Sequence, residues 1–381
     1  MMSRRAQIVW SISATAVVIL AALWVTGRIP RVDNDADATI GAAKRHQAQQ
    51  LSDKDVKLND SEAQAFMQTE TFDRLLKDEN ARKLLSNASM RALIADAELR
   101  PAFTDAAFVA AVRQVAMSDA DAAAFTDAEL QAALARANVR NGLARVEMHA
   151  ALADKKVQAA LASMEARAAF ADDQALAALG DASLMKAFMK ASIQSALRDL
   201  NFRKALADNS LRGSLASSDL KAAFDDADLQ AALARSNVRT GLARAQMQAA
   251  MAQPEFAAAM SSNALHSALA QADLRLAFGD AALMRSMANA NVRANLASSA
   301  MHRAFASAEL QAALAKAELR DRFAGSALKG ALVSAEMRAL MASANFEAAL
   351  KSGAMQAALK QNGFAAALKS TSFATALATA Q

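Results

Sequence analysis

Large apolar residues recur along this chain with an alternating spacing of four and five residues. Between Glu129 and Leu152 they stand at Leu130, Leu134, Val139, Leu143, Met148 and Leu152. Each nine-residue unit therefore has a first apolar site and, four residues later, a second one, and the pattern continues to Phe373 and Leu377. Among the first sites downstream of Leu130, only Ala166 and Ala175 lack a large side chain. We therefore expect residues 163–180 to be the least stable part of the array.

The same period occurs upstream in a phase that differs by four residues, as in Phe72 with Leu76 and Phe108 with Val112. We expect the phase to change between Met117 and Phe125. In a straight α-helix, which turns about 100° per residue, successive units would face opposite sides. Coiled coils repeat about every seven or eleven residues, so this period does not suit one. The pattern predicts that the chain turns once per unit, with one long two-faced helix as the alternative.

Helix-capping residues stand three positions before the first apolar site in most units, at what we call the cap position. Their oxygens can accept the free N–H groups of a first helical turn. They are Asp127, Asp154, Ser163, Asp172, Asp181, Asp199, Asp208, Ser217, Asp226, Ser262, Asp280, Asn289, Ser298 and Ser307. Pro254 directly follows a cap position, where its missing N–H costs nothing. The residue three after the first apolar site is nearly always small, which lets neighbouring helices approach closely.

Each unit therefore predicts a helix of about two turns, which is too short to be stable alone. We expect an all-α fold over residues 66–381, a solenoid or superhelix of very short helices built on the nine-residue repeat. Packing on neighbouring units should hold each helix in place.

Short helices that open on Asn or Asp and carry two apolar residues four apart resemble the STI1-type (DP) repeats of co-chaperones. The segment LLKDENARKLLSNASMRALIADAELRPAF, from Leu75 to Phe103, is the most similar. In that family the cap is usually followed by proline, whereas here only Pro254 keeps it, and this array is far longer than the family's modules. The resemblance implies short helices around an apolar groove that can hold a partner's hydrophobic helix, and it implies no catalytic residue.

The N-terminal residues predict a membrane anchor. A basic start over residues 1–7 precedes an apolar stretch, 8–27, that approaches the roughly 20 residues needed to cross a bilayer. Trp10 and Trp24, the two tryptophans of the chain, stand near its ends, where indole rings meet the membrane surface. We expect a cytoplasmic N-terminus, one transmembrane helix, a polar linker over residues 28–65, and a body outside the cytoplasm. In a Gram-negative cell that compartment is the periplasm, and a cleaved signal peptide is the alternative.

Charge argues against nucleic acid as a partner. Four of the 43 basic residues lie within the first 31, which leaves 39 basic residues against 38 acidic ones. The body is therefore almost neutral, whereas a nucleic-acid-binding domain concentrates positive charge on itself. The chain has no cysteine, so it can form neither disulfides nor thiolate metal sites.

Motifs of catalysis and cofactor binding do not occur in the sequence, which predicts no enzyme activity and no catalytic, cofactor-binding or metal-binding residue. His149, His266 and His302 each follow a first apolar site, in what we call the Arg/Gln position after its usual occupants. A ladder of metal ligands is conceivable, but we expect solvated side chains. Acids before the first apolar site and bases after it are likewise expected to be solvated stripes.

Duplicated blocks favour a structural function over an active site. DAELQAALARANVRNGLAR at Asp127 returns as DADLQAALARSNVRTGLAR at Asp226, eleven units later. We therefore expect a membrane-anchored scaffold or adaptor with a protein partner. The alternatives are a holdase-like chaperone with a groove lined by methionine and phenylalanine, and a lipid- or envelope-binding amphipathic protein. An array whose apolar sites are all covered favours the scaffold.

Overall fold

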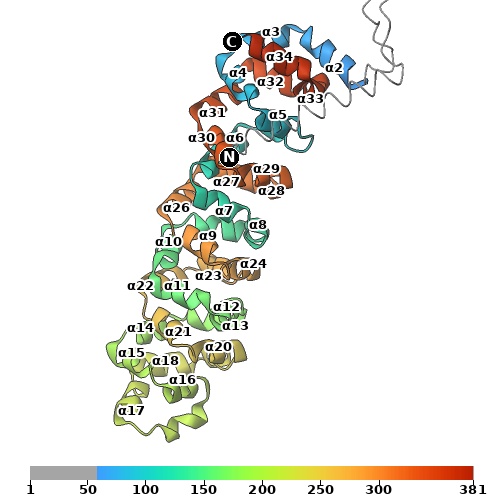
Figure 1. The fold of residues 1–381 in the computed structure, drawn as a ribbon. Helices are drawn as coiled ribbons and strands as arrows, with labels where there is room; N and C mark the ends of the chain where they lie inside the picture. The colour runs from blue at the N-terminus through green and yellow to red at the C-terminus, as the bar shows by residue number, and fades with distance from the viewer. Residues whose placement is uncertain (1–57, 381) are drawn as a thin grey trace, which may run out of the picture. The chain divides into compact units, whose positions relative to one another are not determined.

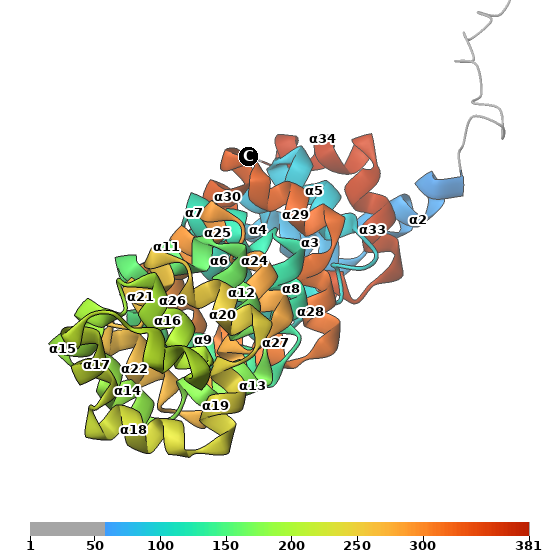
Figure 2. The ribbon, with the colours of Figure 1, turned by 90° about the horizontal axis from the view of Figure 1, so that it is seen from below.

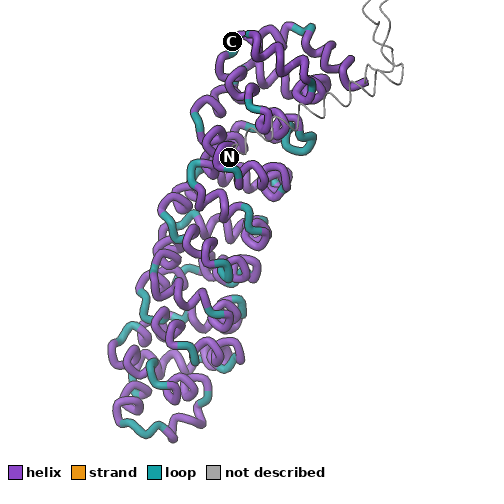
Figure 3. The backbone as a smooth tube through the Cα atoms, in the orientation of Figure 1, coloured by secondary structure: helices purple, strands orange, loops and turns teal. Residues whose placement is uncertain are grey.

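The computed structural model describes residues 58–380, which form a helical array without strands (Figure 3). This part of the chain contains 33 α-helices, from 6 residues in α15 to 11 in α6, and two 3-10 helices. The predicted all-α class and the short helices are therefore confirmed, and a single long helix is excluded for these residues. No helix among them is long and apolar enough to span a bilayer. The predicted anchor, 8–27, lies outside the described residues.

The first half of the array, which we call the outgoing half, consists of α2 (Leu58–Met67), α3 (Glu70–Lys77), α4 (Glu79–Ser86), α5 (Ala88–Ala95), η1 (Ala102–Thr104), α6 (Ala106–Ala116), α7 (Asp119–Phe125), α8 (Ala128–Leu134), α9 (Ala137–Leu143), α10 (Val146–Ala153), α11 (Lys155–Ala162), α12 (Met164–Phe170), α13 (Asp173–Leu179), α14 (Ala182–Phe188), α15 (Ala191–Ala196) and α16 (Leu200–Ala207). The helix α2 begins within the stretch that we expected to be linker.

After η2 (Asn209–Ser214), the returning half consists of α17 (Ser218–Phe224), α18 (Ala227–Ala234), α19 (Ser236–Leu242), α20 (Ala245–Met251), α21 (Pro254–Ala259), α22 (Asn263–Leu269), α23 (Ala272–Phe278), α24 (Ala281–Ser286), α25 (Ala290–Leu296), α26 (Ser299–Ala306), α27 (Ala308–Ala315), α28 (Ala317–Ala324), α29 (Ser326–Val333), α30 (Ala335–Ala342), α31 (Ala344–Lys351), α32 (Gly353–Leu359), α33 (Asn362–Lys369) and α34 (Thr371–Thr379).

The helices start at intervals of nine residues from Ala128 to Thr371, with η2 in the place of one of them. All the cap positions named above hold side chains that accept a backbone N–H of the following helix, so these predicted caps are confirmed. The phase changes after α6, which is longer than the other helices and ends at Ala116, so the new phase begins within the expected stretch from Met117 to Phe125. The next cap, Ser118, is already in the downstream phase.

The two halves run side by side, which the sequence did not predict (Figures 1 and 2). The chain reverses through α16, η2 and α17, so that α14 packs on α18, α13 on α19, α12 on α20 and α11 on α21. The pairing continues through α8 with α24 to α2 with α33. Each helix is therefore held by a helix distant in sequence as well as by its neighbours, unlike a solenoid in which each repeat contacts only the adjacent ones. We call residues 198–225, where the chain reverses, the tip.

The core lies between the halves, and phenylalanines from both meet there. The ring centroids of Phe125 and Phe305 are 5.7 Å apart, and Phe170 lies 5.7 Å from both Phe256 and Phe278. Phe170 belongs to the same helix as Ala166, so its ring and those of the returning half supply apolar volume beside the small side chain. Both Ala166 and Ala175 are fully buried. That residues 163–180 are the weakest stretch stays a prediction, because burial of the two alanines does not measure local stability.

Close approach at the small-residue position joins the two halves. A Cβ atom on Gly142 would lie 2.6 Å from the Cβ atom of Ala277, and one on Gly241 would lie 2.4 Å from the carbonyl oxygen of Gln174. Both neighbours are on the other half of the array. The small residues therefore permit close approach between neighbouring helices, as expected, and these neighbours are far apart in sequence.

Candidate functional surfaces

Cap positions of the two halves face each other in pairs. From one pair to the next, the residue number rises by nine on the outgoing half and falls by nine on the returning half. Arg136 forms an ion pair with Asp280, and Arg235 forms one with Asp181. The Nη2 atom of Arg244 lies 2.8 Å from the Oδ2 atom of Asp172, and Lys190 Nζ lies 2.7 Å from Asp226 Oδ2. The cap positions that lack a capping side chain thus supply the cations for caps on the opposite half. We call these contacts the cap pairs.

The carboxylate of each aspartate in a cap pair has two roles. It accepts hydrogen bonds from the N-terminus of its own helix, and it binds a side chain on the opposite half. In Asp172, Oδ1 accepts the backbone N–H groups of Gln174 and Ala175, while Oδ2 accepts from Arg244. Asp154 does the same within its helix and accepts a hydrogen bond of 2.7 Å from the Ser262 hydroxyl on the other half. One side chain therefore caps a helix and connects it to its partner, and its loss should disturb both.

The pKa values of these carboxyls reflect the double role. Burial raises the pKa of Asp172, but the N–H donors of its helix and Arg244 outweigh that effect and hold the pKa below its usual range. Burial likewise raises the pKa of Asp226, but Lys190 and the helix N–H groups outweigh burial, so the pKa is lowered. A carboxyl with a lowered pKa in the folded state stabilises the protein above its unfolded pKa, and this contribution is lost as pH falls.

The Arg/Gln position caps helix C-termini, which corrects the expectation of a solvated stripe. Arg140 Nη1 donates to the carbonyl oxygens of Leu134 and Ala135, at 2.9 and 3.0 Å, at the end of the preceding helix. Gln158 donates from Nε2 to the Leu152 carbonyl at 2.9 Å, six residues upstream like the Arg140–Leu134 contact. The last carbonyls of a helix have no partner within it, so these side chains fill a need at each turn between helices.

The three histidines do not form a ladder of metal ligands. The rings of His149 and His302 stack across the halves with centroids 4.5 Å apart, whereas His266 takes no part in this stack. His266 is buried, and burial lowers its pKa, so it is not the solvated side chain that we expected. Burial and the neighbouring His302 also lower the pKa of His149. Within residues 58–380 no group of three or more potential metal ligands occurs.

Asp121 is a buried carboxylate at a first apolar site. Asp121 is 3% exposed, and its Oδ1 atom has no hydrogen-bond partner among the described residues. Burial raises the pKa of Asp121 to about 6, against the lowering effects of the Ser118 hydroxyl and of Arg303. The site lies in α7, just after the phase of the repeat changes. This residue was missed by the sequence analysis, although an acid at a site reserved for large apolar residues was a visible signal.

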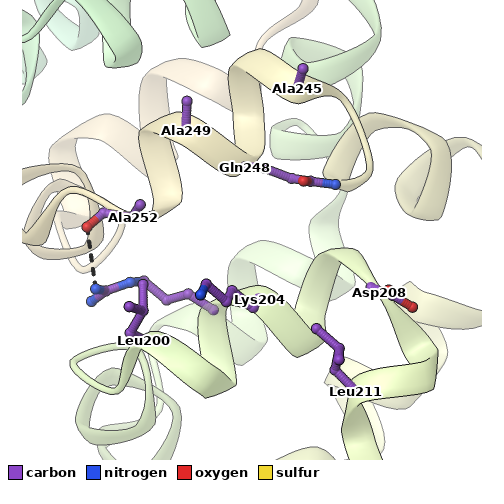
Figure 4. Close-up of a pocket in the computed structure, with 9 residues that line it drawn as sticks. Leu200, Lys204, Asp208, Leu211, Ala245, Gln248, Ala249 and Ala252 are labelled. Carbon is purple, nitrogen blue, oxygen red and sulfur yellow. Dashed lines mark hydrogen bonds between the residues drawn. The ribbon is translucent and has the colours of Figure 1, made fainter.

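Among the described residues downstream of Leu130, two first apolar sites are not buried, and both lie in the tip. They are Leu211, which is 37% exposed, and Leu220, which is half-buried, in two consecutive units. Beside Leu211 lies a cleft of about 470 Å³ between α16 and α20, which also contains Leu200 and Lys204 (Figure 4). Arg203 lines this cleft and a second one of about 400 Å³. Comparison with family models, curated proteins and solved structures finds no match to this chain.

Proposed function

We propose that this chain is a non-enzymatic scaffold or adaptor, anchored in the cell membrane by residues 8–27, with its helical array outside the cytoplasm. The array acts as a spacer that carries a protein-binding surface away from the bilayer. In this proposal the polar residues between the anchor and Leu58 form the connection. A Gram-negative cell would place the array in the periplasm.

The covered core of the array is the observation that carries the proposal. From Leu130 to Phe373, every first apolar site outside the tip is buried, and the methionines at these sites, such as Met148, Met247 and Met301, are fully covered. A lipid-binding amphipathic protein needs a continuous apolar face, and a holdase of the STI1 type needs an open apolar groove. Burial of these sites between the halves covers the repeated apolar stripe that either alternative would use, so the scaffold is favoured.

Duplicated blocks also support a spacer. The segments at Asp127 and Asp226 are nearly identical, yet they pack against different partners, α24 and α14, on opposite halves. A motif reused in two surroundings is suited to building length, because a catalytic residue would need one particular set of neighbours.

Membrane sidedness tests the anchor and the compartment. The full chain should remain in the membrane pellet after alkaline carbonate washing, and external protease should digest the array in cells with a permeabilised outer envelope. Substituting Val18 and Leu20 by arginine should release the chain from the membrane, because a charged side chain at the centre of a span costs about 3 kcal/mol. Substituting Asp33 and Asp35 by arginine is a matched control outside the apolar stretch. Protection of the array from protease in cells whose outer envelope is permeabilised and whose inner membrane is intact would contradict the proposal.

Aggregation assays separate a scaffold from a holdase. At an equimolar ratio, the purified chain should not delay the aggregation of a thermally unfolding test enzyme, because its apolar sites are covered. Delayed aggregation that depends on the core methionines would contradict the scaffold and support the chaperone alternative.

A further inference from the structure

The tip exposes a first apolar site, Leu211, whereas every other such site from Leu130 to Phe373 outside the tip is buried. Apolar side chains that are exposed elsewhere, such as Leu276 and Val333, do not stand at first apolar sites.

Leu200 is 42% exposed and Leu211 is 37% exposed, and both line the cleft between α16 and α20. Figure 4 shows them at its two ends, with Gln248 of α20 on the opposite wall. For Leu211 the cause is local, because η2 stands where the repeat elsewhere places an α-helix. Leu200 is the first residue of α16, a position that is also exposed in Val146 and Met164. Apolar side chains at the edge of a concave surface are typical of binding sites for a partner's side chains.

Positive charge surrounds this cleft and the one beside it. Lys204 and Arg203 line the first, and Lys156, Arg198 and Arg203 line the second. The single acid of the two linings is Asp208, whose Oδ1 atom already accepts hydrogen bonds from the backbone N–H and the hydroxyl of Ser210. The two clefts thus bring four cations together with one carboxylate, in a body whose charges are otherwise nearly balanced.

Arg203 connects the two clefts and the two halves. Its Nη1 atom donates to the Leu197 carbonyl, and its Nη2 atom lies 3.3 Å from the carbonyl oxygen of Ala252, at the end of α20. The guanidinium is therefore committed to the structure, but its charge remains beside the clefts. For Arg198 and Lys204, which are exposed, the described residues include no ion-pair partner.

We propose that the tip binds an acidic amphipathic helix of a partner protein, with leucine-like side chains in the α16–α20 cleft and carboxylates toward Arg198 and Lys204. This inference rests on the proposed scaffold function, for which it names the partner's chemistry. A helix in a groove is anchored by apolar residues along one face, and the cations add attraction and orientation. The cleft between α16 and α20 offers a helix contacts on two walls, which a flat lipid surface would not fill, and this favours a peptide.

Three synthetic peptides of about 18 residues, or five helical turns, test the proposal against the full-length chain in detergent. The first contains Glu, Leu and Ala, the second has Ala in place of Leu, and the third has Lys in place of Glu. Fluorescence anisotropy should show binding of the first peptide, weakened by salt, with affinity at least about tenfold lower for each of the others. Equal binding of the first two peptides would show that the leucines do not contribute, so the site would bind any polyanion and the apolar docking site would be refuted. Binding of the Lys peptide would show that the site does not select acidic partners.

Variants locate the binding site. The double substitution Arg198→Glu with Lys204→Glu should weaken binding of the first peptide at least about tenfold, since both attractions become repulsions. The matched control is Lys360→Glu with Lys369→Glu, which makes the same change in net charge at exposed residues of the returning half far from the tip. Leu200→Gln with Leu211→Gln should also weaken binding while the helical circular dichroism and melting temperature stay unchanged, because both leucines are exposed.

Equal losses in the control and tip variants would show that binding is not at the tip. Peptide binding at the tip by a chain that proves not to be membrane-anchored would leave this inference standing and remove the proposed function. A correctly anchored chain that binds none of the peptides would refute this inference and leave the proposed function standing.

Discussion

Substituting Asp121 by asparagine should remove a cost that the buried carboxylate imposes on the folded protein at neutral pH. The side chain occupies a first apolar site in α7, is 3% exposed, and has an Oδ1 atom without a partner among the described residues. Burial raises the pKa of Asp121 from 3.8 to about 6. One pKa unit corresponds to about 1.4 kcal/mol, so ionising this carboxyl costs the folded state about 3 kcal/mol relative to the unfolded state.

The sign of the pH dependence follows from the direction of this shift. The folded carboxyl holds its proton more tightly than the unfolded one, so the protein is most stable, in this respect, below about pH 4. Stability is lost as pH rises toward the folded pKa and levels off above it. Asparagine cannot ionise, so Asp121→Asn should lack this loss, and the variant should gain about 3 kcal/mol on the wild type between about pH 4 and pH 7.

Urea unfolding followed by circular dichroism, at several pH values for both proteins, measures this difference. Comparing variant with wild type cancels the opposite pH dependence of carboxyls such as Asp172 and Asp226. The matched control is Asp321→Asn, which makes the same chemical change at an exposed position in the middle of α28. The reasoning is refuted if the difference in free energy of unfolding between Asp121→Asn and the wild type is the same at every pH.

Other predictions concern the contacts between and within the halves. Gly241→Ala should destabilise the protein by about 1–3 kcal/mol in urea unfolding, because its Cβ atom would lie 2.4 Å from the Gln174 oxygen. Gly330→Ala, where nothing lies within 4 Å, should instead add about 0.5–1 kcal/mol. Arg140→Ala should cost about 1–3 kcal/mol by leaving two carbonyls unpaired, and Arg140→Gln should restore much of this, since Gln158 makes one such bond; equal losses in both variants would contradict the capping role. Deleting residues 164–172 should disrupt the array, whereas deleting 245–253 as well should restore a stable, shorter one in X-ray scattering, because the cap pairs return to register. In hydrogen exchange, amides of η2 should exchange before those of α12 and α13, and the reverse order would show that Ala166 and Ala175 do weaken their units.

Local structure could be predicted from the sequence because it depends on residues within one unit. An apolar pair four residues apart defines one face of a two-turn helix, and an Asp or Ser three residues earlier caps it. These interactions reach no further than one unit, so the helix starts from Ala128 to Thr371 follow the nine-residue count. The same locality explains why Pro254 stands at the start of α21, where no donor is needed.

The partner of each helix was decided by the tertiary structure. Arg136 and Arg235 occupy the same position in two nearly identical segments, yet one pairs with Asp280 and the other with Asp181, on opposite halves. Nothing within either segment distinguishes these partners, because identical local sequences make identical local structures. The reversal at the tip determines which units face each other, and the cap pairs match Arg or Lys on one half with Asp on the other in that register. The clefts at the tip follow from the same reversal, since packing between the halves ends where the chain turns back.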